Sequence, residues 1–176
     1  FGIVPVIDYG DAPDTYKTLS ASGGPSHGFV PGFFLGATVD GEADGVPTTD
    51  ALGDDIAATD DEDGVTFTSR IEAGGTATVT VVGSPAAPYG KFQMWVDFDG
   101  NGMFTADEQV FTNLKLAAGP NLLSFAVPAG AVAGDSYARA RLAFDAGIGP
   151  TGHVNSGEVE DYKIVIGPTG PLPPPN

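Results

Sequence analysis

Glycine and proline recur so closely along this chain that a helix of more than one or two turns has no room to form. The 176 residues include 26 glycines and 15 prolines, and apolar residues do not recur with the 3.6-residue period of a helix. Apolar and polar residues instead alternate over short segments, as in strands that bury one face. Seven such segments occur, at residues 65–68, 76–82, 92–98, 109–111, 122–127, 137–144 and 162–166. They predict an all-β fold, an antiparallel β-sandwich of jelly-roll or immunoglobulin-like type from about residue 62 to 167.

The chain length fits one domain, which we place at residues 8–167, with a short segment at each end. Residues 1–7 are apolar on both faces and predict a strand that is covered on both sides. The proline-rich residues 168–176 predict an extended polyproline II tail. Residues 8–60 are rich in glycine, proline and aspartate, and a loop region of this length stays ordered only when something holds it. We therefore expect long acidic loops that are ordered by calcium.

The charge of the chain is strongly negative, because 23 acidic residues face 7 basic ones and give a net charge of −16. Such a surface repels nucleic acid and anionic membranes, so we expect neither as a partner. The absence of cysteine excludes disulfides, cysteine nucleophiles and cysteine-ligated zinc. No apolar stretch is long enough to insert into a membrane. Phe1 is not followed by a signal-peptide pattern, so either a leader has been removed or the chain has been shortened.

The most specific pattern in the chain is an acidic loop at residues 97–108. It matches the calcium-loop pattern D-x-[DN]-x-[DN]-G-x₅-E at every specified position. Calcium takes about six to eight hard oxygen ligands, so Ca²⁺ is the predicted cofactor, and Gly102 permits the sharp turn. The predicted ligands are the side chains of Asp97, Asp99, Asn101 and Glu108 and the carbonyl of Met103. Strands flank this loop, unlike the helices of an EF-hand, and the alternative is a solvated acidic hairpin.

Most of the remaining acidic residues also lie in clusters, at residues 8–14, 40–44, 50–63 and 158–161. Like charges at such spacing repel, which is costly unless a divalent cation lies between them. Each cluster is either part of a further metal site or a solvated charge run. The candidate ligands in these clusters are Asp8, Asp11, Asp61, Asp63, Glu158, Glu160 and Asp161.

Several motifs follow one another in a fixed order along residues 8–166. They are DYGDAP at 8–13, GPSH at 24–27, LGATVDGEADG at 35–45, DDEDGV at 60–65, WVDFDGNG at 95–102, YARARL at 137–142 and SGEVEDY at 156–162. Together they resemble the GEVED domain of large secreted and cell-surface bacterial proteins. The resemblance implies an extracellular or cell-surface, β-rich, calcium-loaded module with no established catalytic activity. Met103 departs from the polar residue expected there, but this position donates its carbonyl.

Our first hypothesis for function is a structural subunit that assembles with copies of itself. A strand that is apolar on both faces can add to the open sheet edge of a neighbour. Its four large aliphatic side chains would contribute roughly 6–12 kcal/mol on burial, against association costs of about 4–15 kcal/mol. A head-to-tail contact of this kind does not close, so it produces a filament. The predicted assembly residues are Ile3, Val4, Val6 and Ile7, and the alternative is that this strand packs on its own domain.

Our second hypothesis is a monomeric adhesive or carbohydrate-binding module that uses calcium and binds a surface polysaccharide. Tyr89, Trp95 and the segment 28–34 offer aromatic rings for stacking on sugars. Trp95, however, lies in mid-strand between Met94 and Val96, which favours a buried position.

The third possibility is an enzyme, but we expect no catalytic activity. Ser26, His27, His153 and Ser156 carry groups used in nucleophilic catalysis, but no nucleophile-elbow or zinc-protease motif accompanies them. The spacing of the paired carboxylates is that of cation ligands.

Arg139 and Arg141 alternate with apolar residues on one predicted strand, in a chain with only 7 lysines and arginines. A guanidinium group binds a carboxylate through two parallel hydrogen bonds. We therefore expect at least one of them to pair with an acid near Glu158 or Glu160. The alternative is that both lie on an exposed strand face.

Overall fold

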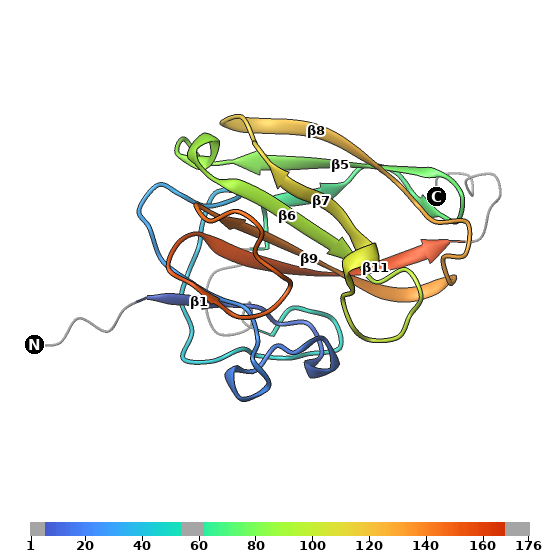
Figure 1. Cartoon of the computed structure of the whole chain (residues 1–176), viewed down its shortest axis with the longest axis horizontal. Coiled ribbons are helices and arrows are strands. Elements are labelled where there is room, and N and C mark those ends of the chain that lie inside the picture. Colours follow the sequence, from blue (N-terminus) through green and yellow to red (C-terminus); the bar gives the residue numbers. More distant parts are fainter. Residues whose placement is uncertain (1–5, 54–61, 168–176) are drawn as a thin grey trace, which may run out of the picture.

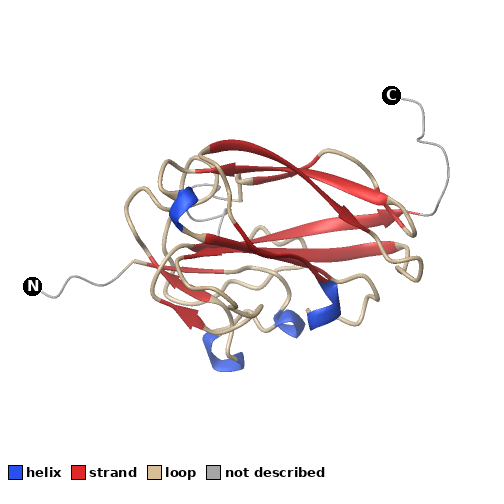
Figure 2. Cartoon of the chain, turned by 45° about the horizontal axis from the view of Figure 1, so that its top comes forward, coloured by secondary structure: helices blue, strands red, loops and turns tan. Residues whose placement is uncertain are grey.

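The computed structural model describes residues 6–53 and 62–167, which form eleven β-strands and four single-turn 3₁₀-helices. This confirms the predicted all-β sandwich (Figures 1 and 2). Residues 1–5, 54–61 and 168–176 lie outside the described part of the chain. The predictions for Ile3, Val4, Asp61 and the proline-rich tail therefore fall outside it.

Two β-sheets pack face to face and form the sandwich (Figure 1). The larger sheet has the strand order β4 (Ile71–Glu72), β11 (Glu158–Gly167), β9 (Gly134–Ala143), β6 (Lys91–Val96) and β7 (Gln109–Leu114). The smaller one has the order β3 (Val65–Phe67), β5 (Thr76–Gly83) and β8 (Gly119–Ala126). These eight strands include all seven of the predicted segments. Pairing in the sandwich is antiparallel except between β4 and β11.

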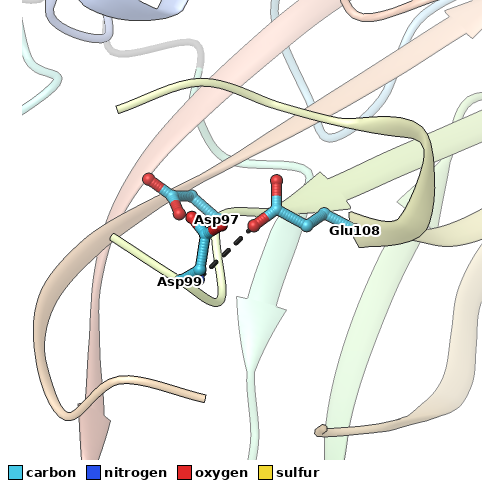
Figure 3. A group of neighbouring side chains, drawn as sticks. All are labelled: Asp97, Asp99 and Glu108. Carbon is cyan, nitrogen blue, oxygen red and sulfur yellow. Dashed lines mark hydrogen bonds between the residues drawn. The ribbon is translucent and has the colours of Figure 1, made fainter. Parts of the chain in front are cut away.

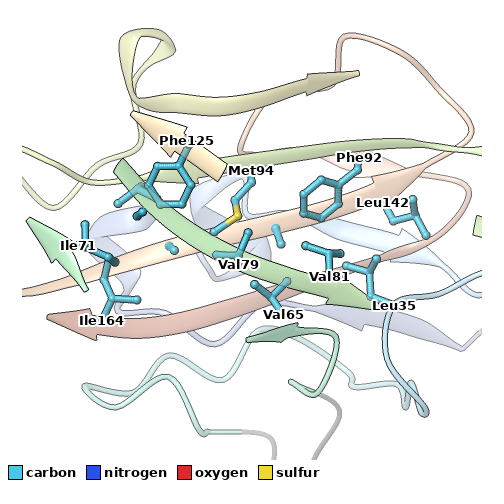
Figure 4. Close-up of a cluster of buried hydrophobic side chains, with 14 of the residues drawn as sticks. Leu35, Val65, Ile71, Val79, Val81, Phe92, Met94, Phe125, Leu142 and Ile164 are labelled. Carbon is cyan, nitrogen blue, oxygen red and sulfur yellow. The ribbon is translucent and has the colours of Figure 1, made fainter. Parts of the chain in front are cut away.

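The hydrophobic core lies between the two sheets (Figure 4). Its side chains come from alternate positions of the strands. On β5, Ala77, Val79 and Val81 are buried while the threonines between them face outward. The facing positions of β9, Ala138 and Ala140, are also fully buried. Small residues on β9 leave room for the larger aromatic and aliphatic side chains of the other strands.

A third small sheet, missed by the sequence analysis, lies outside the sandwich. It consists of β1 (Ile7–Tyr9), β2 (Ser26–Gly28) and β10 (His153–Val154), with β2 and β10 parallel. These strands have only two or three residues, too few for an alternating pattern to be recognised.

Much of residues 6–53, called here the N-terminal layer, covers the face of the five-stranded sheet that points away from the core (Figures 1 and 2). Phe33 and Leu35 of this segment instead join the hydrophobic core. That face carries the side chains of Arg139, Arg141 and Trp95, which are all buried. Trp95 is thus buried as expected, but on the side of the arginines and outside the hydrophobic core cluster. The alternative of an exposed strand face for the two arginines is wrong, because the N-terminal layer covers them.

Candidate metal centre

The acidic loop of residues 97–108 joins two neighbouring strands of the five-stranded sheet. It leaves β6 and enters β7 through the 3₁₀-helix η4 (Ala106–Glu108). Gly100 and Gly102 have φ angles of 70° and 79°, a left-handed conformation that favours glycine. The loop therefore turns sharply between two ends that the sheet holds in place, which brings its acidic side chains together.

Three carboxylates converge in this loop, those of Asp97, Asp99 and Glu108 (Figure 3). Each offers one oxygen atom, and these atoms lie within 4.8 Å of one another. Asp97 and Glu108 are buried and Asp99 is exposed. Among the described residues, none of the ion pairs involves any of the three. Negative groups this close repel one another, and a divalent cation between them would remove that repulsion.

Asp97 is oriented by donors from its own loop and from the N-terminal layer. Its Oδ1 accepts a hydrogen bond from the N–H of Gly100 at 2.7 Å, and its Oδ2 accepts one from the N–H of Gly102 at 3.0 Å. The hydroxyl of Tyr16, at the end of η1 (Asp14–Tyr16), also donates to Oδ2, at 2.7 Å. Burial and the adjacent Asp97 raise the pKa of Tyr16, so its hydroxyl stays protonated and donates. The loop is thus tied directly to the N-terminal layer.

Glu108 closes the loop from its far end. Its Oε1 accepts a hydrogen bond from the N–H of Phe98 at 2.9 Å, and its Oε2 accepts one from the N–H of Thr105 at 3.0 Å, which forms a capping box for η4. Burial raises the pKa of this carboxyl. A bound cation would offset the cost of keeping a charged carboxylate at this buried position.

The two other predicted ligand residues continue the loop between these carboxylates. The side-chain oxygen of Asn101 accepts a hydrogen bond from the N–H of Met103 at 2.8 Å, and its amide donates to Asp99 at 2.9 Å. The Met103 side chain is half exposed. Oxygen atoms make up the whole donor set, and oxygen ligands suit calcium or magnesium and not the softer transition metals. The residues present therefore fit a hard divalent cation.

Glu158 and Glu160 lie apart from this loop, on the core-facing side of β11. Both are buried, and each accepts a hydrogen bond from a backbone N–H: Leu35 donates to Glu158 at 2.5 Å and Gly64 donates to Glu160 at 2.9 Å. These bonds attach the segments before β3 to the edge of β11.

Asp8, Asp11 and Asp63 also accept backbone hydrogen bonds. The donors and distances are Val159 to Asp8 at 2.6 Å, Gly53 to Asp11 at 2.8 Å and Ala37 to Asp63 at 2.9 Å. In the described part of the chain, the loop carboxylates form the one group of three acidic or histidine side chains close enough to share an ion. Metal binding by the other predicted ligands stays a prediction.

Arg139 and Asp161 form a buried ion pair beneath the N-terminal layer, and both side chains are fully buried. Arg139 Nε and Nη2 donate to the two carboxylate oxygens at 2.7 and 2.8 Å, the bidentate geometry expected of this pair. Its Nη1 donates to the carbonyl oxygens of Tyr16 at 3.0 Å and of Pro150 at 2.9 Å. This confirms the predicted pairing with an acid near Glu160. The pair joins β9 and β11 to the chain segment that carries Tyr16.

Within the described residues, Arg141, two residues further along β9, has no acidic partner among its hydrogen bonds. Its Nε donates to Nε2 of His27 at 2.8 Å, and its other nitrogens donate to three backbone carbonyls of residues 149–152. His27 Nδ1 in turn donates to the carbonyl of Ser156 at 2.7 Å. Burial and the charge of Arg141 hold the pKa of His27 well below its usual value, so the ring is neutral. His27 is thus a hydrogen-bonding residue, as expected, but its pairing with Arg141 was not apparent from the sequence.

A second serine–histidine contact lies at the surface of the small sheet. The hydroxyl of Ser26 and Nδ1 of His153 are 2.9 Å apart, and His153 Nε2 is 3.1 Å from Oδ1 of Asn155. Ser26 and His153 are register partners on β2 and β10, so this contact follows from the strand pairing.

The acidic loop and the Arg139–Asp161 ion pair lie within the one segment that matches a known family. Residues 91–165, from β6 to the last part of β11, match the family model of the GEVED domain. Comparisons with curated proteins and with solved structures find no match. The matched segment contains the acidic loop, both arginines of β9 and the motif of residues 156–162, which carried the resemblance in the sequence. Over residues 91–165, the chain therefore matches the GEVED domain, which supports the resemblance seen in the sequence.

Proposed function

We propose that this protein is an extracellular structural module that calcium stabilises and that assembles with copies of itself. One observation carries the calcium part: three carboxylates of a complete calcium-loop sequence lie within 4.8 Å of one another. The family match supports a module of this type. The described helices include none long and apolar enough to cross a membrane.

Calcium at this loop would act on more than the loop itself. Asp97 and Glu108 would hold the ion from both ends of the segment between β6 and β7. Through Tyr16, which donates to Asp97 at 2.7 Å, the ion would also fix the N-terminal layer against the sheet. In a chain without cysteine, such ions and the buried polar contacts take the place that disulfides occupy in many secreted domains.

Thermal unfolding tests the calcium part. The fluorescence of Trp95, the one tryptophan, should report a higher melting temperature in calcium than in chelator. An ion present at a thousand times its dissociation constant adds about 4 kcal/mol, which corresponds to roughly 8–16 °C for a chain of this length.

Two substitutions in the loop make this test specific. Glu108→Gln should remove most of the calcium-dependent shift, because it replaces a predicted ligand. Asp107→Asn is the matched control, since Asp107 is exposed and occupies no ligand position of the pattern. Equal melting temperatures in calcium and in chelator for the unchanged protein would refute the calcium proposal.

The assembly part of the proposal concerns the start of the chain. Val6 is 48% exposed, which leaves it available for a contact outside its own domain. Ile7 pairs with Gly28 of the same chain, so a link to a neighbour would begin before β1. Negative-stain electron microscopy in millimolar calcium tests this link. Filaments that vanish when residues 1–7 are deleted would support it, and dispersed particles under all conditions would refute it.

The second candidate function is that of an adhesive module for a surface polysaccharide. A hollow of about 200 Å³ beside the acidic loop favours it, because its lining combines aromatic and hydroxyl groups. The lining includes Thr15, Tyr16, Lys17, Phe104, Thr105 and Thr151. A glycan array separates this function from assembly: calcium-dependent binding of a sugar by dispersed protein would favour adhesion.

A further inference from the structure

Strand β8 is the longest regular sheet edge in the described part of the chain. It pairs with β5 over eight residues without a register shift. The other edges are short, irregular or covered: β3 and β4 have three and two residues, and the ladder of β7 is interrupted by register shifts. At the edge of β1, the N–H of Glu42 donates to the carbonyl of Ile7 at 2.9 Å. In Figure 1, β8 lies at the outer margin of the sandwich.

Alternate residues of β8 direct their backbone N–H and C=O groups away from β5. The N–H of Thr68 donates to the carbonyl of Thr78 at 2.8 Å, so even-numbered residues of β5 bond toward β3. Odd-numbered residues of β5 therefore bond toward β8, where their register partners are also odd-numbered. The residues with outward backbone groups are Pro120, Leu122, Ser124 and Ala126. Within the described residues, no hydrogen bond occupies the N–H groups of the last three.

This edge lacks the usual protection against pairing with another chain. Natural edge strands carry charged side chains, bulges or prolines. Strand β8 has no charged residue, and its single proline, Pro120, lies near its start. Leu122 is 84% exposed on the outer face of the sheet. The adjacent outward positions of β5, Thr76, Thr78 and Thr80, are also uncharged.

We propose that two copies of this protein pair edge to edge through β8. Antiparallel pairing centred on Ser124 would place Leu122 opposite Ala126 of the partner subunit. The hydrogen-bonded pairs of that register exchange about six backbone hydrogen bonds. The two three-stranded sheets become one continuous six-stranded sheet. Pro120, which has no N–H, lies beyond these pairs and ends the register.

The uncharged edge of β8 is the place where two copies can meet with the least charge repulsion. Each copy carries a net charge of −16, so two copies repel wherever their acidic surfaces meet. An uncharged strand lowers that cost at the contact, and an antiparallel strand is complementary to itself about a two-fold axis. The pairing uses neither the acidic loop nor residues 1–7, so it goes beyond the proposed function and can fail separately from it.

Sedimentation of the full chain over a wide range of protein concentration tests this pairing. The unchanged protein should form dimers as concentration rises. Ser124→Pro should abolish them, because proline removes an outward N–H and leaves the hydrogen bonds to β5 in place. Ser124→Ala keeps that N–H and should form dimers like the unchanged protein. The melting temperature of each variant shows whether it is folded.

A cysteine variant tests the register directly and remains decisive if Ser124→Pro does not fold. The natural chain has no cysteine, so Ser124→Cys can form a disulfide only between two copies. Oxidation should convert it to a covalent dimer, whereas the control Thr112→Cys, on the edge strand β7, should remain monomeric. Monomers of the unchanged protein at every concentration would overturn the proposal. So would equal cross-linking of both cysteine variants, or assemblies that persist in Ser124→Pro and disappear on deletion of residues 1–7.

Discussion

Replacing Arg139 by methionine should destabilise the fold more than any other single change to a basic residue. The arginine is fully buried, and its loss leaves the Asp161 carboxylate buried without its cation. Breaking a buried ion pair by removing one partner costs about 3–5 kcal/mol. For a chain of this length, that corresponds to a fall in melting temperature of roughly 6–20 °C.

Two further variants separate the ion pair from a general effect of losing an arginine. Arg70→Met is the surface control, because Arg70 and Glu72 form a partly exposed pair at 3.4 Å, worth about 0–1 kcal/mol. The double variant Arg139→Met/Asp161→Asn also removes the negative charge that Arg139→Met leaves buried on Asp161. It should therefore recover part of the stability that Arg139→Met loses.

Urea unfolding followed by Trp95 fluorescence measures all of these variants, because Trp95 lies opposite Arg139 in the register of β6 and β9. A loss for Arg139→Met no larger than that for Arg70→Met would refute the reasoning. It would mean that the N-terminal layer is not held by this pair.

Two other changes probe the same layer, and a third probes the turn before β11. Because the fold holds the pKa of His27 well below 6.5, His27 binds a proton in the unfolded chain at pH values where it stays neutral in the folded chain. The free energy of unfolding should therefore fall as the pH drops below about 6.5, by up to about 1.4 kcal/mol per pH unit. Thermal melts of His27→Gln over the same pH range should lack this slope. Tyr16→Phe removes the hydrogen bond to Asp97 and should cost about 1.5–3 kcal/mol in urea unfolding, whereas an unchanged midpoint would contradict a link between the layer and the loop. Gly157→Ala should prevent native folding, as judged by loss of a cooperative melt, since Gly157 has a φ of 89° and a Cβ there would collide with the carbonyl of Leu142.

The sandwich and the acidic loop were predictable because their signals are local. Alternation along residues 76–82 identifies β5 without reference to any other strand. The loop of residues 97–108 likewise carries its acidic residues and its turn within twelve consecutive residues. Short-range patterns of this kind can be recognised in a single sequence without an alignment.

The polar interior between the sheet and the N-terminal layer was predicted only in part. The pairing of Arg139 with a nearby acid followed from the chemistry of a guanidinium group. Its burial did not, since the alternation of Tyr137, Arg139 and Arg141 with apolar residues is the pattern of a strand with one solvated face. Many partners of these arginines are backbone carbonyls, for example those of Tyr16 and Gly152, and a carbonyl has no signature in sequence.

The contacts of the N-terminal layer also set the order in which the chain can fold. The Asp8 carboxylate accepts a hydrogen bond from the N–H of Val159, and the backbone N–H of Asp11 donates to the Asp161 carboxylate, across 151 and 150 residues of sequence. Contacts of such long range form slowly, because a large loop must close before they contribute. During synthesis, the N-terminal layer therefore emerges first and has nothing to dock on until β11 has left the ribosome. We therefore expect this aspartate- and glycine-rich segment to stay hydrated until then and to close over the sheet as a last step.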